Sequence, residues 1–155
     1  VFSQSVRVNE KTFIRRDFIN FDVQKIDDAI GSYCVNDYIG FNDIKGDEWY
    51  YNTVKTAALM GIVNGDENGN FNPDMPITRQ DAALMVYRAY KDLLSADNDD
   101  QRFADCDDIS EYAREAVGVL AENKIINGRD DNKFDPKMNI TRAEAAVIVY
   151  RVINN

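Results

Sequence analysis

Two arginines occupy matching positions in a repeated motif and have the chemistry to bind an anion. Arg79 lies in Ile-Thr-Arg-Gln-Asp, and Arg142 lies 63 positions later in Ile-Thr-Arg-Ala-Glu. Each guanidinium is expected just inside a helix N-terminus, where a cation opposes the helix dipole at a cost of about 0.3–1 kcal/mol. Backbone N–H groups at a helix start and a guanidinium fork together suit a bound carboxylate. The alternative is that each arginine pairs with a loop aspartate, such as Asp74 or Asp135, and only fixes the loop.

The composition argues against catalysis, metal binding and nucleic-acid binding. The chain has 155 residues, a net charge of −9 and no histidine. An acidic chain lacks the basic face that nucleic acid requires, and the missing histidine removes the commonest general base and metal ligand. Cys34 and Cys106 cannot form a zinc site alone, and the sequence leaves open one disulfide or two free thiols. We therefore expect no enzyme and no cofactor, with a paired-carboxylate glycosidase as the remaining catalytic alternative.

The arginine motifs belong to a longer repeat. Residues 49–90 and 112–153 agree at 16 of 42 positions without a gap, and a fixed period of this kind indicates a repeated supersecondary unit. In each copy, Thr-x-x-acid is a capping-box pattern, and apolar residues follow it at helical spacing. The sequence predicts helices from Thr78 to about Leu94 and from Thr141 to Ile153, each preceded by another helix and a loop. The expected fold class is mainly α, with the small residues of the closing helices allowing close packing at the centre.

The repeat pattern divides the chain into four parts. We expect a degenerate or truncated first repeat over residues 1–40, a full repeat over 41–94, an acidic linker over 95–102 and a second full repeat over 103–155. Residues 13–26, with Arg15, are either a degenerate copy of the capped helix or an unrelated amphipathic helix. No stretch approaches the length of a transmembrane helix, and the first residues are neither an initiator Met nor a signal peptide. We expect a piece of a longer protein.

The loops between paired helices carry glycines and acidic residues. Gly65 and Gly128 are expected to adopt positive φ and to allow close approach of a ligand to the backbone. Asp66 opens an acidic stretch, but the glycine and glutamate spacing of an EF-hand is missing, so no calcium is predicted. Trp49 either stacks on a sugar face or, as its place in the helical pattern favours, lies in the core with one edge exposed.

The spaced motif as a whole resembles the S-layer homology domain. The pattern reads Phe-x-Asp-Ile, then Trp, Ala and Gly-Ile-x-x-Gly-Asp-x-x-Gly-x-Phe-x-Pro, then Ile-Thr-Arg-x-Asp. The residues that carry it are Phe41, Asp43, Trp49, Ala57, Gly61, Gly65, Asp66, Gly69, Phe71, Pro73, Ile77, Thr78, Arg79 and Asp81. The resemblance covers roughly residues 41–153, and residues 13–26 more weakly.

The resemblance implies a fold and a function. The fold is a pseudo-threefold spindle of loop-helix-loop-helix repeats around a central helix bundle. The function is noncovalent attachment of a larger surface protein to the bacterial cell wall, through a secondary cell wall polysaccharide that often bears pyruvate ketals. Ligand is expected in grooves between neighbouring prongs, without nucleic acid and without membrane insertion. The implied ligand-binding residues are Arg79, Arg142, Trp49, Gly65, Asp66, Gly128, Tyr112 and Arg15.

The second repeat departs from the family pattern at three positions. Tyr112 stands where tryptophan is usual, Arg129 matches Asp66 of the first full repeat, and Asn132 matches Gly69. These departures and the shortened first repeat favour an alternative, a structural or protein-interaction module with degenerate sugar grooves that packs against neighbouring domains of the parent protein. Domain swapping with another chain is a further alternative.

Overall fold

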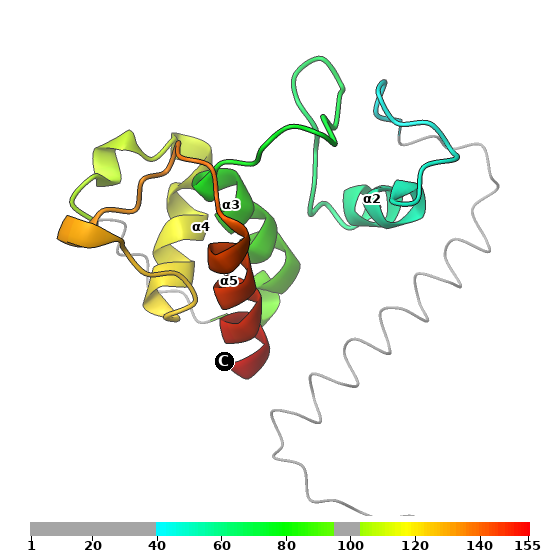
Figure 1. Ribbon diagram of the computed structural model, residues 1–155. Coiled ribbons are helices and arrows are strands. Elements are labelled where there is room, and N and C mark those ends of the chain that lie inside the picture. The colour runs from blue at the N-terminus through cyan, green and yellow to red at the C-terminus, as the bar shows by residue number, and fades with distance from the viewer. Residues whose placement is uncertain (1–39, 95–102) are drawn as a thin grey trace, which may run out of the picture. The chain divides into compact units, whose positions relative to one another are not determined.

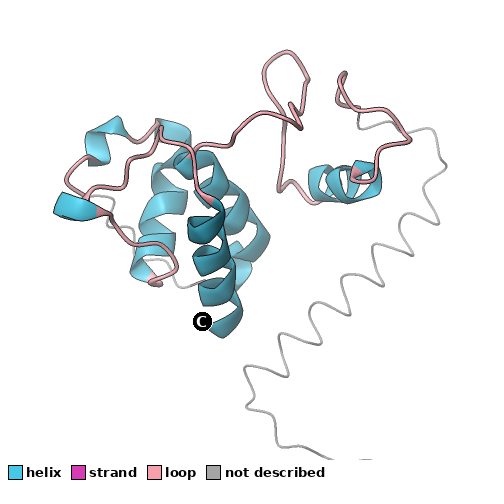
Figure 2. Ribbon diagram, viewed as in Figure 1, coloured by secondary structure: helices cyan, strands magenta, loops and turns pink. Residues whose placement is uncertain are grey.

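The computed structural model describes residues 40–94 and 103–155, and these residues are mainly helical (Figures 1 and 2). The predicted mainly α class is confirmed, while the spindle arrangement stays a prediction. Within the described residues, extended pairing is confined to one isolated bridge between Thr78 and Asn139. The predictions for residues 13–26, for Cys34 and for the acidic linker fall outside the described residues. The helical elements in chain order are α2 (Tyr51–Leu59), α3 (Arg79–Tyr90), η1 (Lys91–Leu93), η2 (Cys106–Asp108), α4 (Glu111–Glu122), η3 (Asp130–Asn132) and α5 (Arg142–Asn154).

The closing helices α3 and α5 begin where the capping patterns predict. The Thr141 hydroxyl accepts from the backbone N–H of Glu144 at 3.2 Å, and the Glu144 carboxylate accepts from the backbone N–H of Thr141 at 2.9 Å. This reciprocal pair is a complete capping box. At α3, the Thr78 hydroxyl accepts from the backbone N–H of Asp81 at 3.2 Å. Both threonines therefore satisfy N–H groups that a helix start would leave without partners.

The loop before each closing helix is held by an aspartate from the start of the same repeat. The Asp43 carboxylate accepts the backbone N–H groups of the two residues from Phe71 at 2.8 and 2.6 Å. The Asp105 carboxylate accepts the equivalent pair from Phe134 at 2.7 and 2.8 Å. Charged acceptors make short, strong hydrogen bonds to backbone donors. The repeated Phe-x-Asp pattern thus builds the same loop twice.

Two hydrophobic clusters stabilise the described residues. The larger unites α3, α4 and α5, which gather in Figure 1, through apolar side chains that solvent scarcely reaches. Its buried members are Ala83, Phe103, Ile109, Ala113, Val117, Leu120, Ile125, Ile126, Phe134, Ile148 and Val152. The smaller is centred on Phe41, Ile44 and Val63 in the first full repeat. No helix in either described range is long and apolar enough to cross a membrane.

The expectation that Trp49 lies in the core is wrong. Its side chain is 92% exposed and only meets Tyr50 edge-on, with ring centroids 5.4 Å apart. The physical reason is that α2 begins at Tyr51. Trp49 therefore precedes the helix and does not share the helical face that packs inward.

The two loop glycines differ in conformation. Gly65 has φ +69°, as predicted, and a Cβ at this position would lie 2.5 Å from the Phe41 ring and 2.7 Å from the Asn70 carbonyl oxygen. The positive φ predicted for Gly128 is wrong. In that loop Asp131 and Asn132 take the left-handed conformation instead, with φ of 55° and 54°. Asn132 corresponds to Gly69, which also has positive φ, so the left-handed residue that is new in the second loop is Asp131, whose short polar side chain tolerates this conformation.

A matched pair of substitutions tests this difference. Gly65→Ala should destabilise the fold by at least about 2 kcal/mol, because it adds both backbone strain and a clash. Gly128→Ala should cost less, because its Cβ meets only Asn132 at 3.2 Å or more without a left-handed backbone. Chemical denaturation of both variants measures the two losses. Equal losses would contradict the assignment of strain to Gly65.

Candidate functional site

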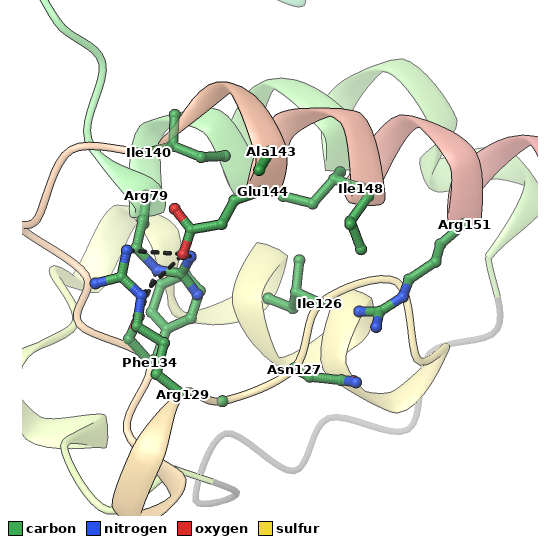
Figure 3. A pocket seen from close by; sticks show the side chains of 12 residues that line it. Arg79, Ile126, Asn127, Arg129, Phe134, Ile140, Ala143, Glu144, Ile148 and Arg151 are labelled. Carbon is green, nitrogen blue, oxygen red and sulfur yellow. Dashed lines mark hydrogen bonds and ion pairs between the residues drawn. The ribbon is translucent and has the colours of Figure 1, made fainter.

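A groove of about 260 Å³ lies at the junction of the two full repeats. The first repeat contributes Arg79 at the start of α3, and the second contributes its loop and α5 (Figure 3). Figure 3 shows Arg79, Arg129 and Glu144 together at one end and Arg151 at the other, with Ile126 and Ile148 between them. The complete lining is Arg79, Ile126, Asn127, Gly128, Arg129, Phe134, Ile140, Ala143, Glu144, Val147, Ile148 and Arg151.

Arg79 is the deepest charge of the groove and holds the two repeats together. Its side chain is only 6% exposed. The guanidinium donates from Nε to the Phe134 carbonyl oxygen at 2.7 Å and from Nη1 to Glu144 at 2.8 Å, and it lies 5.0 Å from the centroid of the Phe134 ring. Burial lowers the pKa of Arg79, while the Glu144 carboxylate opposes that shift. The predicted loop aspartates are not its partners; its carboxylate partner comes from the helix of the next repeat.

The N–H groups at the start of α3 are not free for a ligand. The backbone N–H of Arg79 donates to the Met138 carbonyl oxygen at 2.8 Å, and that of Gln80 donates to the Pro136 carbonyl oxygen at 3.0 Å. The sequence predicted a carboxylate site made of helix N–H groups and a guanidinium. For Arg79, the part of this prediction that concerns the N–H groups is wrong. The neighbouring loop takes up these donors because the junction buries them. These two N–H groups therefore cannot contribute to an anion site in the groove.

Glu144 accepts from two arginines of different repeats. Its Oε1 lies 2.8 Å from Arg79 Nη1, 2.8 Å from Arg129 Nε and 2.7 Å from Arg129 Nη2. Burial alone would raise the pKa of Glu144, but the backbone N–H of Thr141 and the Arg129 guanidinium lower it to about 2. The carboxylate is therefore ionised at any physiological pH. One acidic side chain serves as helix cap and as counter-ion at once.

Arg129 and Arg151 are groove residues that the sequence did not single out as ligand contacts. Arg129 also donates to Asp135 at 3.2 Å and keeps 31% of its side chain exposed. Arg151 donates to the Ile125 carbonyl oxygen at 3.4 Å. Two features of the sequence could have identified these arginines. Arg151 ends the recurring Val-Tyr-Arg sequence, and Arg129 stands where the first full repeat has Asp66. The groove lining therefore holds three arginines against one carboxylate, around an apolar floor.

The residues that the resemblance implied do not form one site. Arg79 and Gly128 line the groove, whereas Arg142 is exposed on α5 and is not among the lining residues. Trp49, Gly65 and Asp66 belong to the other repeat and do not reach this groove. Arg15 falls outside the described residues.

Tyr112, also implied as a ligand contact, instead fixes the start of α3. Its hydroxyl donates to Asp81 at 2.7 Å and accepts from the Gln80 amide at 2.7 Å. Burial and the Asp81 carboxylate raise the pKa of Tyr112. A tryptophan could not accept the hydrogen bond from Gln80, because indole has only a donor. The exchange of tryptophan for tyrosine thus fits a junction contact.

The sequence profile of the S-layer homology domain matches residues 40–83 and 102–146, one match in each repeat. The chain belongs to the S-layer homology domain family. It is 38% identical over 116 residues to an amylopullulanase of Thermoanaerobacterium thermosulfurigenes, covering 73% of this chain and 6% of that protein. It is 35% identical over 109 residues to the surface-layer 125 kDa protein of Lysinibacillus sphaericus, covering 70% of this chain and 9% of that protein.

A third S-layer homology relative is a cellulosome-anchoring protein of Acetivibrio thermocellus. The identity is 27% over 117 residues, with 75% of this chain and 26% of that protein covered. The chain thus spans a small part of each of these relatives. Family membership indicates a location at the bacterial cell surface.

Because Arg79 and Arg129 share the Glu144 carboxylate, we expect the stability of the S-layer homology junction to depend on pH. The pKa of Glu144 falls from its ordinary value of 4.5 to about 2, so its stabilisation is complete above pH 4.5 and is lost as pH falls towards 2. Glu144→Gln keeps an acceptor for the cap but removes the carboxylate that pairs with Arg79 and one of the two that pair with Arg129. We expect a loss of about 1–2 kcal/mol at pH 7.

The loss should shrink between pH 4.5 and pH 2, because the wild-type carboxylate becomes protonated there. Urea unfolding at a series of pH values measures this loss, and Glu67→Gln, at an exposed position in the loop of the first full repeat, serves as the control. A loss for Glu144→Gln that is independent of pH would show that the ion pairs at this junction do not stabilise the fold.

Proposed function

We propose that this chain is a noncatalytic anchor that binds an acidic secondary cell wall polysaccharide in the groove at the repeat junction. The anchor would tether a larger surface protein to the cell wall. The observation that supports the proposal most directly is the charge of the groove: three arginines face one carboxylate in a chain whose net charge is −9. A local excess of cations in an acidic protein is suited to one anionic ligand and not to polyanions in general.

The shape of the groove suits a sugar that carries a carboxylate. Arg79 and Arg129 lie at one end, where a carboxylate could share their guanidinium donors with Glu144. Ile126 and Ile148 provide an apolar floor beside this cluster, and a sugar ring has an apolar face that packs on such a surface. A pyruvate ketal presents a carboxylate fixed to the sugar ring. We therefore infer a pyruvylated saccharide as the ligand class.

The relatives support an anchoring role over a catalytic one. In the amylopullulanase and in an exoglucanase of Acetivibrio thermocellus, the matched segment is 6% and 11% of the protein. The same kind of segment occurs in proteins named for a surface layer and for cellulosome anchoring. A module shared by proteins named as enzymes and proteins named for a surface layer or for anchoring supports a common attachment over a common reaction.

One observation favours the alternative role as an interaction module. Val149, Tyr150 and Ile153 of α5 are exposed, Tyr150 by 68%. The equivalent residues of α3, which are Val86, Tyr87 and Tyr90, pack against the larger core cluster. A neighbouring domain of the parent protein would cover such a face. This role and wall binding make opposite predictions for the assay below.

The first test is sedimentation of the chain with native cell wall sacculi and with sacculi stripped of secondary polymer. The wild type should sediment only with native sacculi. Arg79→Lys keeps the charge but loses the paired donors to Phe134 and Glu144. It should bind at least about tenfold more weakly, the equivalent of ~1.4 kcal/mol.

Arg114→Lys is the matched control, since Arg114 is exposed on α4 outside the groove. It should bind like the wild type, and far-UV circular dichroism should show that both variants are folded. Equal binding by folded Arg79→Lys would remove the groove as the site. A folded wild type that binds neither kind of sacculus would favour the interaction module.

A further inference from the structure

The loops of the two full repeats share a backbone hydrogen bond, and the residue that donates it differs in charge between them. The backbone N–H of Asp66 donates to the Asn70 carbonyl oxygen at 2.8 Å, and that of Arg129 donates to the Lys133 carbonyl oxygen at 2.7 Å. These pairs are 63 positions apart in the sequence, like the rest of the repeat. Asp66 and Arg129 are therefore equivalent in structure as well as in alignment. Their side chains have opposite charge.

The Asp66 carboxylate accepts hydrogen bonds within its own loop. One carboxylate oxygen accepts the backbone N–H groups of Asn68 and Asn70, both at 2.9 Å. The other accepts from the side-chain amide of Asn72 at 2.9 Å. The hydrogen bonds from Asn70 and Asn72 lower the pKa of Asp66, so this carboxylate stays charged. An anionic ligand that approached the first repeat at this point would meet a negative charge.

Arg129 instead leaves its loop and enters the groove. Its guanidinium reaches Glu144 on α5 and Asp135, and the side chain is neither buried nor fully exposed. With Arg129, the lining has a formal excess of two positive charges over Glu144. With an aspartate there, as in the first repeat, the excess would vanish. One residue thus decides whether the groove lining carries a net positive charge.

We propose that Arg129 is the specificity-determining residue that makes this junction the acidic-saccharide site. The equivalent surface of the first full repeat, with Asp66 in that place, would not take a saccharide that bears a carboxylate. This inference rests on the proposed function, and it adds which repeat carries the selectivity and through which side chain. Of the two arginines at this end of the groove, Arg129 is the more accessible to the ligand's carboxylate, since 31% of its side chain is exposed against 6% for Arg79.

The experiment exchanges charge at the two equivalent positions. Arg129→Asp installs the first-repeat residue and should lower binding to native sacculi at least about tenfold. Arg129→Gln removes the charge while keeping a donor for Glu144, and should also lower binding. Arg129→Lys should recover most of it. Asp66→Asn, the control at the equivalent position, should leave binding within about twofold of the wild type.

Salt dependence separates ligand contact from a purely structural role. Binding of the wild type and of Arg129→Lys should weaken steeply with added NaCl, and the residual binding of Arg129→Gln should depend on salt less steeply. Melting temperatures of all variants show whether they are folded. A structural role would lower stability but would leave the salt dependence of binding unchanged.

The outcomes distinguish this inference from the proposed function. If folded Arg129→Gln and Arg129→Asp bind like the wild type while Arg79→Lys does not, Arg129 is not the determinant and the junction remains the site. The same conclusion follows if Asp66→Asn changes binding as much as Arg129→Gln does. If the folded wild type does not bind native sacculi, both the function and the inference are overturned.

Discussion

The arrangement of the described residues depends on one shared carboxylate. Glu144 caps α5 within its own repeat, accepts from Arg79 of the preceding repeat and orients Arg129 of its own loop. A buried guanidinium without a counter-ion would cost several kcal/mol, so this carboxylate is what permits Arg79 to enter the interior. The helix start, the contact between repeats and the electrostatics of the groove are therefore consequences of a single group. The capping-box glutamate, a common local device, acts here over a sequence separation of 65 residues.

The repeats show how a constant scaffold carries variable chemistry. Asp43 and Asp105 organise their loops through the same pair of backbone hydrogen bonds, and an aromatic pair stands beside each, with ring centroids 5.3 Å apart in both cases. These contacts involve backbone groups or rings, so they constrain only a few side chains. Positions 66 and 129 lie outside these shared contacts and carry opposite charges: Asp66 is hydrogen-bonded within its own loop, whereas Arg129 pairs with Glu144 of α5. Two repeats with the same shared contacts thus present different charges at an equivalent position.

Local signals in the sequence predicted the local structure well. The Thr-x-x-acid patterns placed the starts of α3 and α5, because a helix cap depends on residues three positions apart. The candidate site was predicted less well, because its partners come from distant parts of the chain. The burial of Arg79, its pairing with Glu144 and the loss of its helix N–H groups to Met138 and Pro136 are set by how the repeats pack. Trp49 fits a helical pattern in the sequence, but α2 begins just after it. Gly128 does not take the left-handed backbone of its equivalent Gly65, and Asp131 of the same loop is left-handed, a difference that the shared glycine could not reveal.

Neither repeat forms the groove alone. Arg79 comes from one unit, and Gly128, Arg129 and Glu144 come from the other, so each unit alone holds an incomplete set of groups. In an array of such units, sites of this kind would be counted by junctions and not by units. A recombination event that deletes either partner would remove the site entirely, whereas one that inserts a compatible unit would create a junction at each new boundary. Gene duplication in such an array would therefore change the number of binding sites one junction at a time. Each new junction would form a site only if its two units carry the two complementary sets of groove residues.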